Sequence, residues 1–308
     1  MPTSFKEIIK FLININILIM NKLSRRQFLG KSVLGIGSVV IASQIPLDLA
    51  AGVLPIPVKM PVGFQSWIVR EKIGIDFPGT LKMVADMGYQ SVEMCSPPGY
   101  ENLGFGPLMK LKAKEMKKII NDTGLTWPST HYGMDELRQH IDERIEFAKE
   151  SGQTQMILSS FGLPEKATIS DWLKAADELN IMGSKTMKSG IQMGYHNHDM
   201  EFEKIGDTLI YDALMSQLDP RYVKMQFQVA VISKGYKAST YFKKYPGRFI
   251  SAHLADWSAT EKKQVPIGKG IVDWKEFFAT LKTAGVKNFF VEMGIETFKE
   301  SANYIHSL

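Results

Sequence analysis

The segment IQMGYHNHDMEFE, residues Ile191–Glu203, contains the pattern from which the fold is inferred. An apolar run up to Tyr195 ends abruptly in the polar tetrapeptide His196–Asp199. Such a run is typical of a parallel strand that is buried on both faces. In α/β barrels, the functional side chains lie at the carboxyl ends of such strands. The alternative is a solvated turn between a strand and a helix, where Asn and Asp are common.

Short apolar runs alternate with amphipathic helical patterns from Val58 to the end of the chain. The helical pattern Asp273–Gly285 begins with an N-capping acid and ends with a C-capping glycine. Eight runs in about 250 residues predict an α/β fold of the (β/α)8 TIM barrel class. An open doubly wound sheet is disfavoured because the first run lacks a glycine-rich phosphate turn. The eight runs are Val58–Trp67, Ser91–Met94, Thr126–Tyr132, Gln155–Phe161, Ile191–His198, Val223–Ala230, Phe249–Asp256 and Asn288–Met293.

Composition excludes several classes of protein. The chain has 308 residues, is 44% hydrophobic and carries a formal charge of +5. Residues 1–50 hold six of the 37 basic and two of the 32 acidic residues, which leaves 31 against 30 in the remainder. A near-neutral remainder lacks the electrostatic footprint of a nucleic-acid binder. The single cysteine, Cys95, excludes an internal disulfide and a cysteine-based zinc site.

The N-terminal segment resembles a twin-arginine export signal. The hexapeptide Ser24–Leu29, SRRQFL, precedes an apolar stretch of small residues, and a cleavage zone is expected near Ala50 and Ala51. We therefore expect residues 1–51 to form a signal peptide and residues 58–308 to form one barrel domain. The resemblance implies export to the periplasm, with no membrane attachment after the leader is removed. The true start is either Met1 or Met20, since the compact leader MNKLSRRQFLG begins at the latter.

Residues able to do chemistry gather at the carboxyl ends of the predicted strands, whereas His140 and His306 fall on helical patterns and are expected at the surface. Glu292 follows three apolar residues, where an ionised carboxylate is costly unless it is paired. A divalent cation shared by adjacent strands would supply that partner, and imidazole with carboxylate ligands suits Mn, Fe, Co or Zn. The strand-end residues are Glu93, His131, His196, His198, Gln228, His253, Asp256 and Glu292.

Five motifs together resemble the sugar phosphate isomerase/epimerase family, the xylose isomerase-like TIM barrels. The similarity covers roughly Met60 to the C-terminus, and secreted members with a YHNHD strand and a twin-arginine leader form a branch of the family. The motifs are Gly194–Asp199 (GYHNHD), His253–Trp257 (HLADW), Val265–Gly270 (VPIGKG), Asp273-Trp274 and Val291-Glu292.

The resemblance implies one divalent metal, held in relatives by Glu, Asp, His and Glu from strands five to eight. His253 and Glu292 match the last two positions. His196 stands where the first Glu is expected, and Gln228 replaces the usual Asp. A neutral amide oxygen is a weaker ligand than a carboxylate, so we expect lower metal affinity than in relatives.

Loss of the first Glu also affects the expected chemistry, because a two-base epimerase needs a base on each face of the reacting carbon. Glu292 would serve one face, and a neutral His196, His198 or His131 would have to serve the other, although a metal-bound imidazole is a poor base. Otherwise the chemistry is one-sided, or the site has become a binding pocket.

Four further residues are candidates for contacting the substrate. Lys269 would contact a hydroxyl or phosphate group, or else it is an ordinary loop lysine. Glu93, Trp67 and Trp257 fit a sugar-stacking wall, or alternatively they pack at the barrel rim.

The sequence thus predicts a metal-dependent isomerase or epimerase that abstracts a proton next to the carbonyl of a sugar or keto-sugar. Export favours a free sugar over a phosphorylated one. One alternative is a lyase that eliminates the aglycone from an oxidised glycoside, and another is a carbohydrate-binding barrel that has lost turnover. An abasic-site endonuclease shares this barrel but is disfavoured by the near-neutral charge. The expected partner is a small sugar, with no nucleic acid, and a homodimer is left open.

Overall fold

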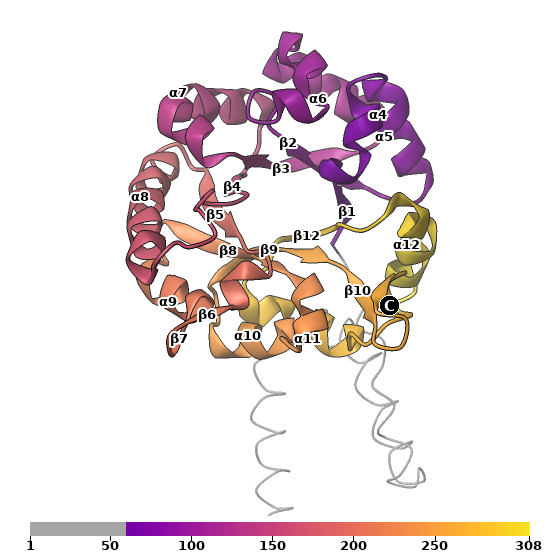
Figure 1. Cartoon of the computed structure of the whole chain (residues 1–308). Coiled ribbons are helices and arrows are strands. Elements are labelled where there is room, and N and C mark those ends of the chain that lie inside the picture. Colours follow the sequence, from indigo (N-terminus) through magenta and orange to yellow (C-terminus); the bar gives the residue numbers. More distant parts are fainter. Residues whose placement is uncertain (1–59) are drawn as a thin grey trace, which may run out of the picture. The chain divides into compact units, whose positions relative to one another are not determined.

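Each of the eight predicted runs forms a parallel strand, and the strands close into a barrel (Figure 1). The structure is a computed structural model that describes residues 60–308; the predicted leader and both candidate start positions lie outside these residues. Going around the barrel, each strand pairs with the next along the list below, and β12 pairs with β1. The strands are β1 (Val62–Gln65), β2 (Ser91–Cys95), β3 (Thr126–Tyr132), β4 (Gln155–Leu158), β5 (Gln192–His196), β8 (Val223–Gln228), β9 (Phe249–Leu254) and β12 (Asn288–Val291). The prediction of a (β/α)8 barrel is therefore confirmed, and the alternative of an open doubly wound sheet is excluded.

Helices surround the barrel and cover its outer face (Figure 1). The predicted helix at Asp273–Gly285 is confirmed as α11 (Trp274–Ala284), and Asp273 caps it by accepting from Glu276 N at 2.9 Å. Gly285 ends α11 with φ +91°, a backbone conformation that favours glycine. The helices are α4 (Arg70–Ile73), α5 (Phe77–Asp86), α6 (Ala113–Asp122), α7 (Met134–Ser151), α8 (Ile169–Met187), α9 (Ile210–Gln217), α10 (Ala238–Lys244), α11 (Trp274–Ala284) and α12 (Phe298–His306).

The two faces of the barrel strands differ in chemistry. Outward residues such as Phe64 and Phe227 are fully buried and pack against helical aromatics, among them Phe298 of α12 and Phe242 of α10. At the carboxyl ends of several strands, the inward positions are polar and buried. Alternation with period two therefore places the apolar core outside the barrel wall and a polar layer inside it.

The segment after β9 is folded around one buried carboxylate, that of Asp256. This segment contains the antiparallel pair β10 (Asp256–Ser258) and β11 (Lys263–Val265), followed by the VPIGKG motif. A Cβ atom on Gly270 would lie 2.1 Å from Asp256 Oδ1, so only glycine allows this close approach. The carboxylate accepts hydrogen bonds from Trp257 N (2.9 Å), Gly268 N (2.9 Å), Gly270 N (3.1 Å), Val272 N (3.2 Å) and Trp274 Nε1 (2.8 Å).

Within residues 60–308, no helix combines the length and the apolar character needed to cross a membrane.

We expect Asp256→Asn to lower the free energy of unfolding by about 3 kcal/mol or more. An asparagine amide can accept at only one of its two terminal atoms, and each hydrogen bond to a charged group contributes roughly 1.5–3 kcal/mol. Urea denaturation would measure the change. Glu261→Gln, at an exposed position of the same segment, is the control and should change stability by less than about 0.5 kcal/mol. Equal stability of the two variants would contradict this account of the loop.

Candidate active site

Glu93 lies at the centre of the polar layer inside the barrel and has no exposed surface. Its carboxylate is within hydrogen-bonding distance of side chains from four other strands, and His131 Nε2 also lies 3.1 Å from Oε2. This position differs from the sugar-stacking wall expected from the sequence, because protein groups surround the carboxylate. Its hydrogen-bonding partners are Gln65 Nε2 (2.8 Å), Ser129 Oγ (2.6 Å), Gln226 Nε2 (2.9 Å) and His253 Nε2 (2.5 Å).

The charge on Glu93 is stabilised by the two neighbouring histidines. Burial by itself would raise the pKa of this carboxyl group, but the charges and hydrogen bonds of His131 and His253 hold the pKa well below its ordinary value. Glu93 is therefore ionised in the folded protein. Its charge is compensated within the barrel, as a buried carboxylate requires.

His253 connects this interior carboxylate to the mouth of the barrel. Its Nε2 bonds Glu93, and its Nδ1 lies 2.9 Å from Oε2 of Glu292. Burial opposes protonation, yet the two carboxylates raise the pKa of His253 to about 9. Glu292 is partly exposed, and its pKa is lowered because His253 outweighs the effect of burial. Gln228 Nε2 donates to the same Oε2 atom at 2.6 Å.

Three buried histidines, one of which is His253, lie close together at this point. Ring nitrogens of His131, His196 and His253 all lie within 4.8 Å of one another, so these three residues could hold a metal ion. The sequence placed His196 and His253 among the ligands but assigned His131 to catalysis only. The signal for including it was its position at the end of β3, beside β2, which bears Glu93.

Two imidazole nitrogens at the site lack a hydrogen-bonding partner among the residues that the structure describes. They are Nδ1 of His196 and Nδ1 of His198, and both are buried. Burial lowers the pKa of both histidines, that of His196 strongly, so the rings are neutral and their lone pairs are available. Neutral imidazoles next to the carboxylate of Glu292 fit a divalent metal of the transition series. Gln228 fits less well as a ligand, because its Nε2 donates to Glu292 and its Oε1 accepts from Ala230 N (3.2 Å).

The YHNHDMEF motif is held in place by its own side chains. Glu201 is fully buried and accepts from the hydroxyl of Tyr195 and, at 2.8 Å, from the backbone N of His198. Asn197 Oδ1 accepts from Gln228 N at 3.2 Å, which links the end of β5 to the end of β8. These contacts orient the two histidines that alternate with Asn197. His196 and Asn197 are thus buried at the end of the strand, whereas Asp199 and Met200 are exposed in the turn that follows.

The remaining candidates lie at the rim of the barrel. Trp67 is half-buried, with its ring centroid 6.0 Å from that of Tyr100 and the Arg70 guanidinium 4.3 Å above it. Trp257 is half-buried in β10, and Lys269 is exposed, 3.3 Å from Glu300. Their contacts with a substrate stay predictions.

The two histidines expected outside the site, His140 and His306, are both exposed, as predicted.

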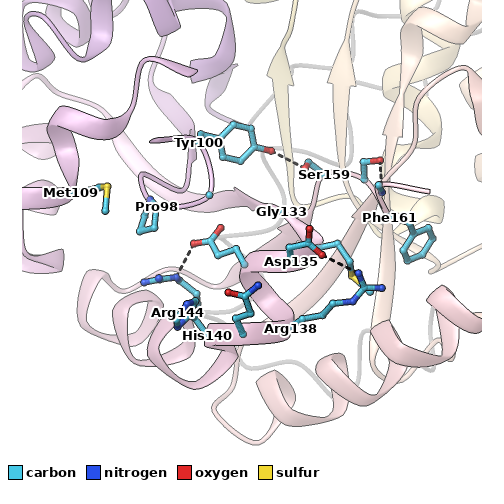
Figure 2. Close-up of a pocket in the computed structure, with 16 residues that line it drawn as sticks. Pro98, Tyr100, Met109, Gly133, Asp135, Arg138, His140, Arg144, Ser159 and Phe161 are labelled. Carbon is cyan, nitrogen blue, oxygen red and sulfur yellow. Dashed lines mark hydrogen bonds and ion pairs between the residues drawn. The ribbon is translucent and has the colours of Figure 1, made fainter. Parts of the chain in front are cut away.

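A pocket of about 740 Å³, which sequence reasoning did not identify, opens among the segments that follow β2, β3 and β4 (Figure 2). Figure 2 shows Tyr100 and Ser159 on one side of it and side chains of α7, among them Arg144, on the other.

Comparison with known proteins identifies the same architecture. The family model described as xylose isomerase-like TIM barrel matches residues 81–308. None of the curated proteins matches the chain. Among solved structures, a sugar phosphate isomerase/epimerase from Parabacteroides distasonis is 23% identical, with a TM-score of 0.64 over 81% of this chain and 96% of that one.

Two further solved structures are similar in fold and contain a metal. A xylose isomerase-like TIM barrel protein from Mycobacterium smegmatis in complex with magnesium is 13% identical, with a TM-score of 0.61 over 81% of this chain and 96% of that one. The IOLI protein with a bound zinc atom is also 13% identical, with a TM-score of 0.60 over 80% and 94%. At these identities the likeness shows the fold alone.

We expect Glu93→Gln to lower the free energy of unfolding by about 3–5 kcal/mol, because it removes the charge that compensates His253 and turns an acceptor into a donor. Urea denaturation of the metal-free protein would measure the loss. Glu203→Gln is the matched control, since Glu203 is exposed and its ion pair with Lys234 should contribute less than about 1 kcal/mol. If both variants unfold like the wild type, Glu93 does not organise the barrel interior.

Proposed function

Because the chain belongs to the family of xylose isomerase-like TIM barrels, we propose that it is a metal-dependent sugar isomerase or epimerase that moves a proton next to a carbonyl group. The observation that carries this proposal is the cluster of three buried histidines, His131, His196 and His253, with the partly exposed Glu292 bonded to His253 Nδ1 at 2.9 Å. Perturbed titratable groups that converge at the carboxyl ends of barrel strands are typical of catalytic sites.

His196, His253 and Glu292 are the residues proposed to hold the metal. His131 could replace one of the two histidines, since the ring nitrogens of all three lie within 4.8 Å of one another, and Glu292 adjoins this group through His253 Nδ1 at 2.9 Å. A divalent ion bound there would supply Lewis-acid polarisation of the substrate carbonyl. Solved structures of the same fold contain magnesium or zinc, which supports a metal of this charge without fixing its identity. His253 must lose a proton to act as a ligand, since both of its nitrogens now face carboxylates.

The protein's own residues suit proton transfer. Glu292 is partly exposed and ionised, and His253 and Gln228 hold its Oε2 atom in place, so its carboxylate is oriented before substrate enters. His198 is neutral because burial lowers its pKa, and a neutral imidazole can accept a proton. Glu93 takes no direct part in this scheme, since it has no exposed surface and instead fixes His253. We propose Glu292 as the base on one face, with His198 or His131 serving the other.

A lyase is the second candidate, and the position of Glu93 favours it. With Glu93 enclosed by the protein, Glu292 is the strand-end carboxylate that reaches the barrel mouth, and one base is enough for elimination. In that reaction Glu292 would take the proton next to the carbonyl of an oxidised glycoside, and the aglycone would leave. The export signal proposed for residues 1–51 favours either substrate over a phosphorylated sugar. A binding barrel without turnover is the third candidate, and the neutral Gln228 is its support.

Metal binding is the first test. We expect the purified protein to bind Mn²⁺, Co²⁺ or Zn²⁺ with one ion per chain. His196→Ala and His253→Ala should each weaken binding by at least tenfold, because each removes a proposed ligand. Gln228→Asp should strengthen it, since a carboxylate replaces an amide. Calorimetric titration provides the measurement, and His140→Ala, which removes an exposed histidine from α7, should match the wild type. Wild-type protein that takes up none of the three ions would overturn the metal-dependent proposal.

Proton abstraction is the second test. We expect the metal-loaded protein in D2O to exchange the proton next to the carbonyl of D-fructose, D-tagatose or a methyl glucoside oxidised at carbon 3, followed by NMR. Glu292→Gln should slow this exchange by about 10²–10⁴-fold, the range for loss of a general base. Glu296→Gln, four residues away and exposed, is the control. Release of methanol from the oxidised glucoside would identify the lyase, and unimpaired exchange in Glu292→Gln would exclude Glu292 as the base.

A further inference from the structure

The pocket of about 740 Å³ beside the barrel mouth has no role in the chemistry proposed above (Figure 2). Three connections line it: residues 98–100 and Met109 after β2, Gly133 with α7 as far as Arg144 after β3, and residues 159–162 after β4. All three follow carboxyl ends of barrel strands, so the pocket opens on the same side of the barrel as the histidine cluster. Its size is within the range of small-molecule sites.

Backbone and side-chain contacts join the pocket to the candidate active site. Gly133 is two residues beyond His131, roughly 7 Å along an extended chain, and Ser159 N donates to Tyr132 O at 3.0 Å. Tyr100 lies between the two regions: its ring contacts Trp67, and its hydroxyl donates to Ser159 Oγ at 2.7 Å. The pocket and the histidine cluster are therefore adjacent along the chain at the end of β3, where Gly133 lines the pocket and His131 belongs to the cluster.

The charges that line the pocket compensate one another. Arg138 forms a bidentate pair with Glu178, both contacts at 2.9 Å, and also contacts Asp135 at 3.0 Å. Arg144 Nε lies 2.7 Å from Oε1 of Glu136, a buried carboxylate. With each of these cations already paired, the pocket offers little attraction to a phosphate or carboxylate ligand. It suits a neutral ligand instead.

Uncharged hydrogen-bonding groups alternate with apolar surface on the pocket walls. Ser160 and Gln139 supply a hydroxyl and an amide, whereas Pro98 and Met109 supply apolar contact. Glu136 also lines the pocket, and its Oε2 atom, which has almost no exposed surface, has no hydrogen-bonding partner among residues 60–308. Hydroxyl groups on an apolar ring framework, as in a sugar, match this combination of donors, acceptors and apolar contacts.

We propose that this pocket is a second sugar subsite, so that the substrate is a disaccharide or another glycoside with two units. One unit lies at the histidine cluster and the other, neutral and hydroxylated, lies between Tyr100 and α7. This inference rests on the proposed function, because it assumes that a sugar occupies the histidine cluster.

The experiment compares binding of glucose with binding of cellobiose, maltose and sucrose by calorimetric titration of the full chain. We expect at least one disaccharide to bind about tenfold or more tightly than glucose. Gln139→Trp, which places an indole in the pocket, should abolish this advantage and leave glucose binding unchanged. Glu146→Trp adds the same side chain at an exposed position of α7 outside the pocket, and it should behave like the wild type.

The outcomes separate the two proposals. If glucose binds but no disaccharide binds more tightly, or if Gln139→Trp keeps the advantage, the second subsite is wrong and the proposed function stands. If none of the four sugars binds, both the subsite and the sugar-directed function are contradicted. Thermal unfolding of the two tryptophan variants, each expected to match the wild type, shows that any loss arises at the pocket.

Discussion

The buried charge of Glu93 is the constraint on which the centre of this barrel depends. An ionised carboxylate without solvent contact is costly, and here the cost is offset by five partners from four other strands, since His131 and Ser129 both lie on β3. Because each partner must point inward at one level of the barrel, the carboxylate fixes the relative positions of these strands. The register agrees with this, since Gln65, Glu93 and Ser129 are paired across β1, β2 and β3.

A row of charged groups leads from Glu93 through His253 to Glu292 at the barrel mouth. Glu93 bonds one nitrogen of His253, and the other nitrogen meets Glu292, which is partly exposed at the barrel mouth. The interior network thus sets the orientation of a group that can reach a substrate. Such positioning by residues that do not themselves contact the ligand is how a rigid scaffold prepares a reactive site.

Two other buried carboxylates organise the loops around the mouth in the same way. Asp256 gathers backbone N–H groups of the segment after β9, and Glu201 binds the hydroxyl of Tyr195 and the backbone of His198. In each case an acid within a loop satisfies donors that would otherwise be left without partners. Motifs that suggest catalysis in the sequence, such as HLAD and VPIGKG, therefore also have a structural explanation, because their Asp and Gly residues build the loop.

The sequence alone determined the number and kind of elements, because strand and helix periodicity are local properties. It also located most of the reactive side chains, since polar residues that end apolar runs mark the carboxyl ends of barrel strands. It could not determine which of them pair: Glu93 and His253 are 160 residues apart and meet only because the barrel closes. For the same reason Gln226 escaped notice, although it bonds both Glu93 and His131, and Glu93 was placed on a substrate wall rather than inside. Closure of the eight strands, with their register, decided that His196 and His198 are neutral and each keep one unpartnered nitrogen among the described residues. It also decided that His253 is held between two carboxylates.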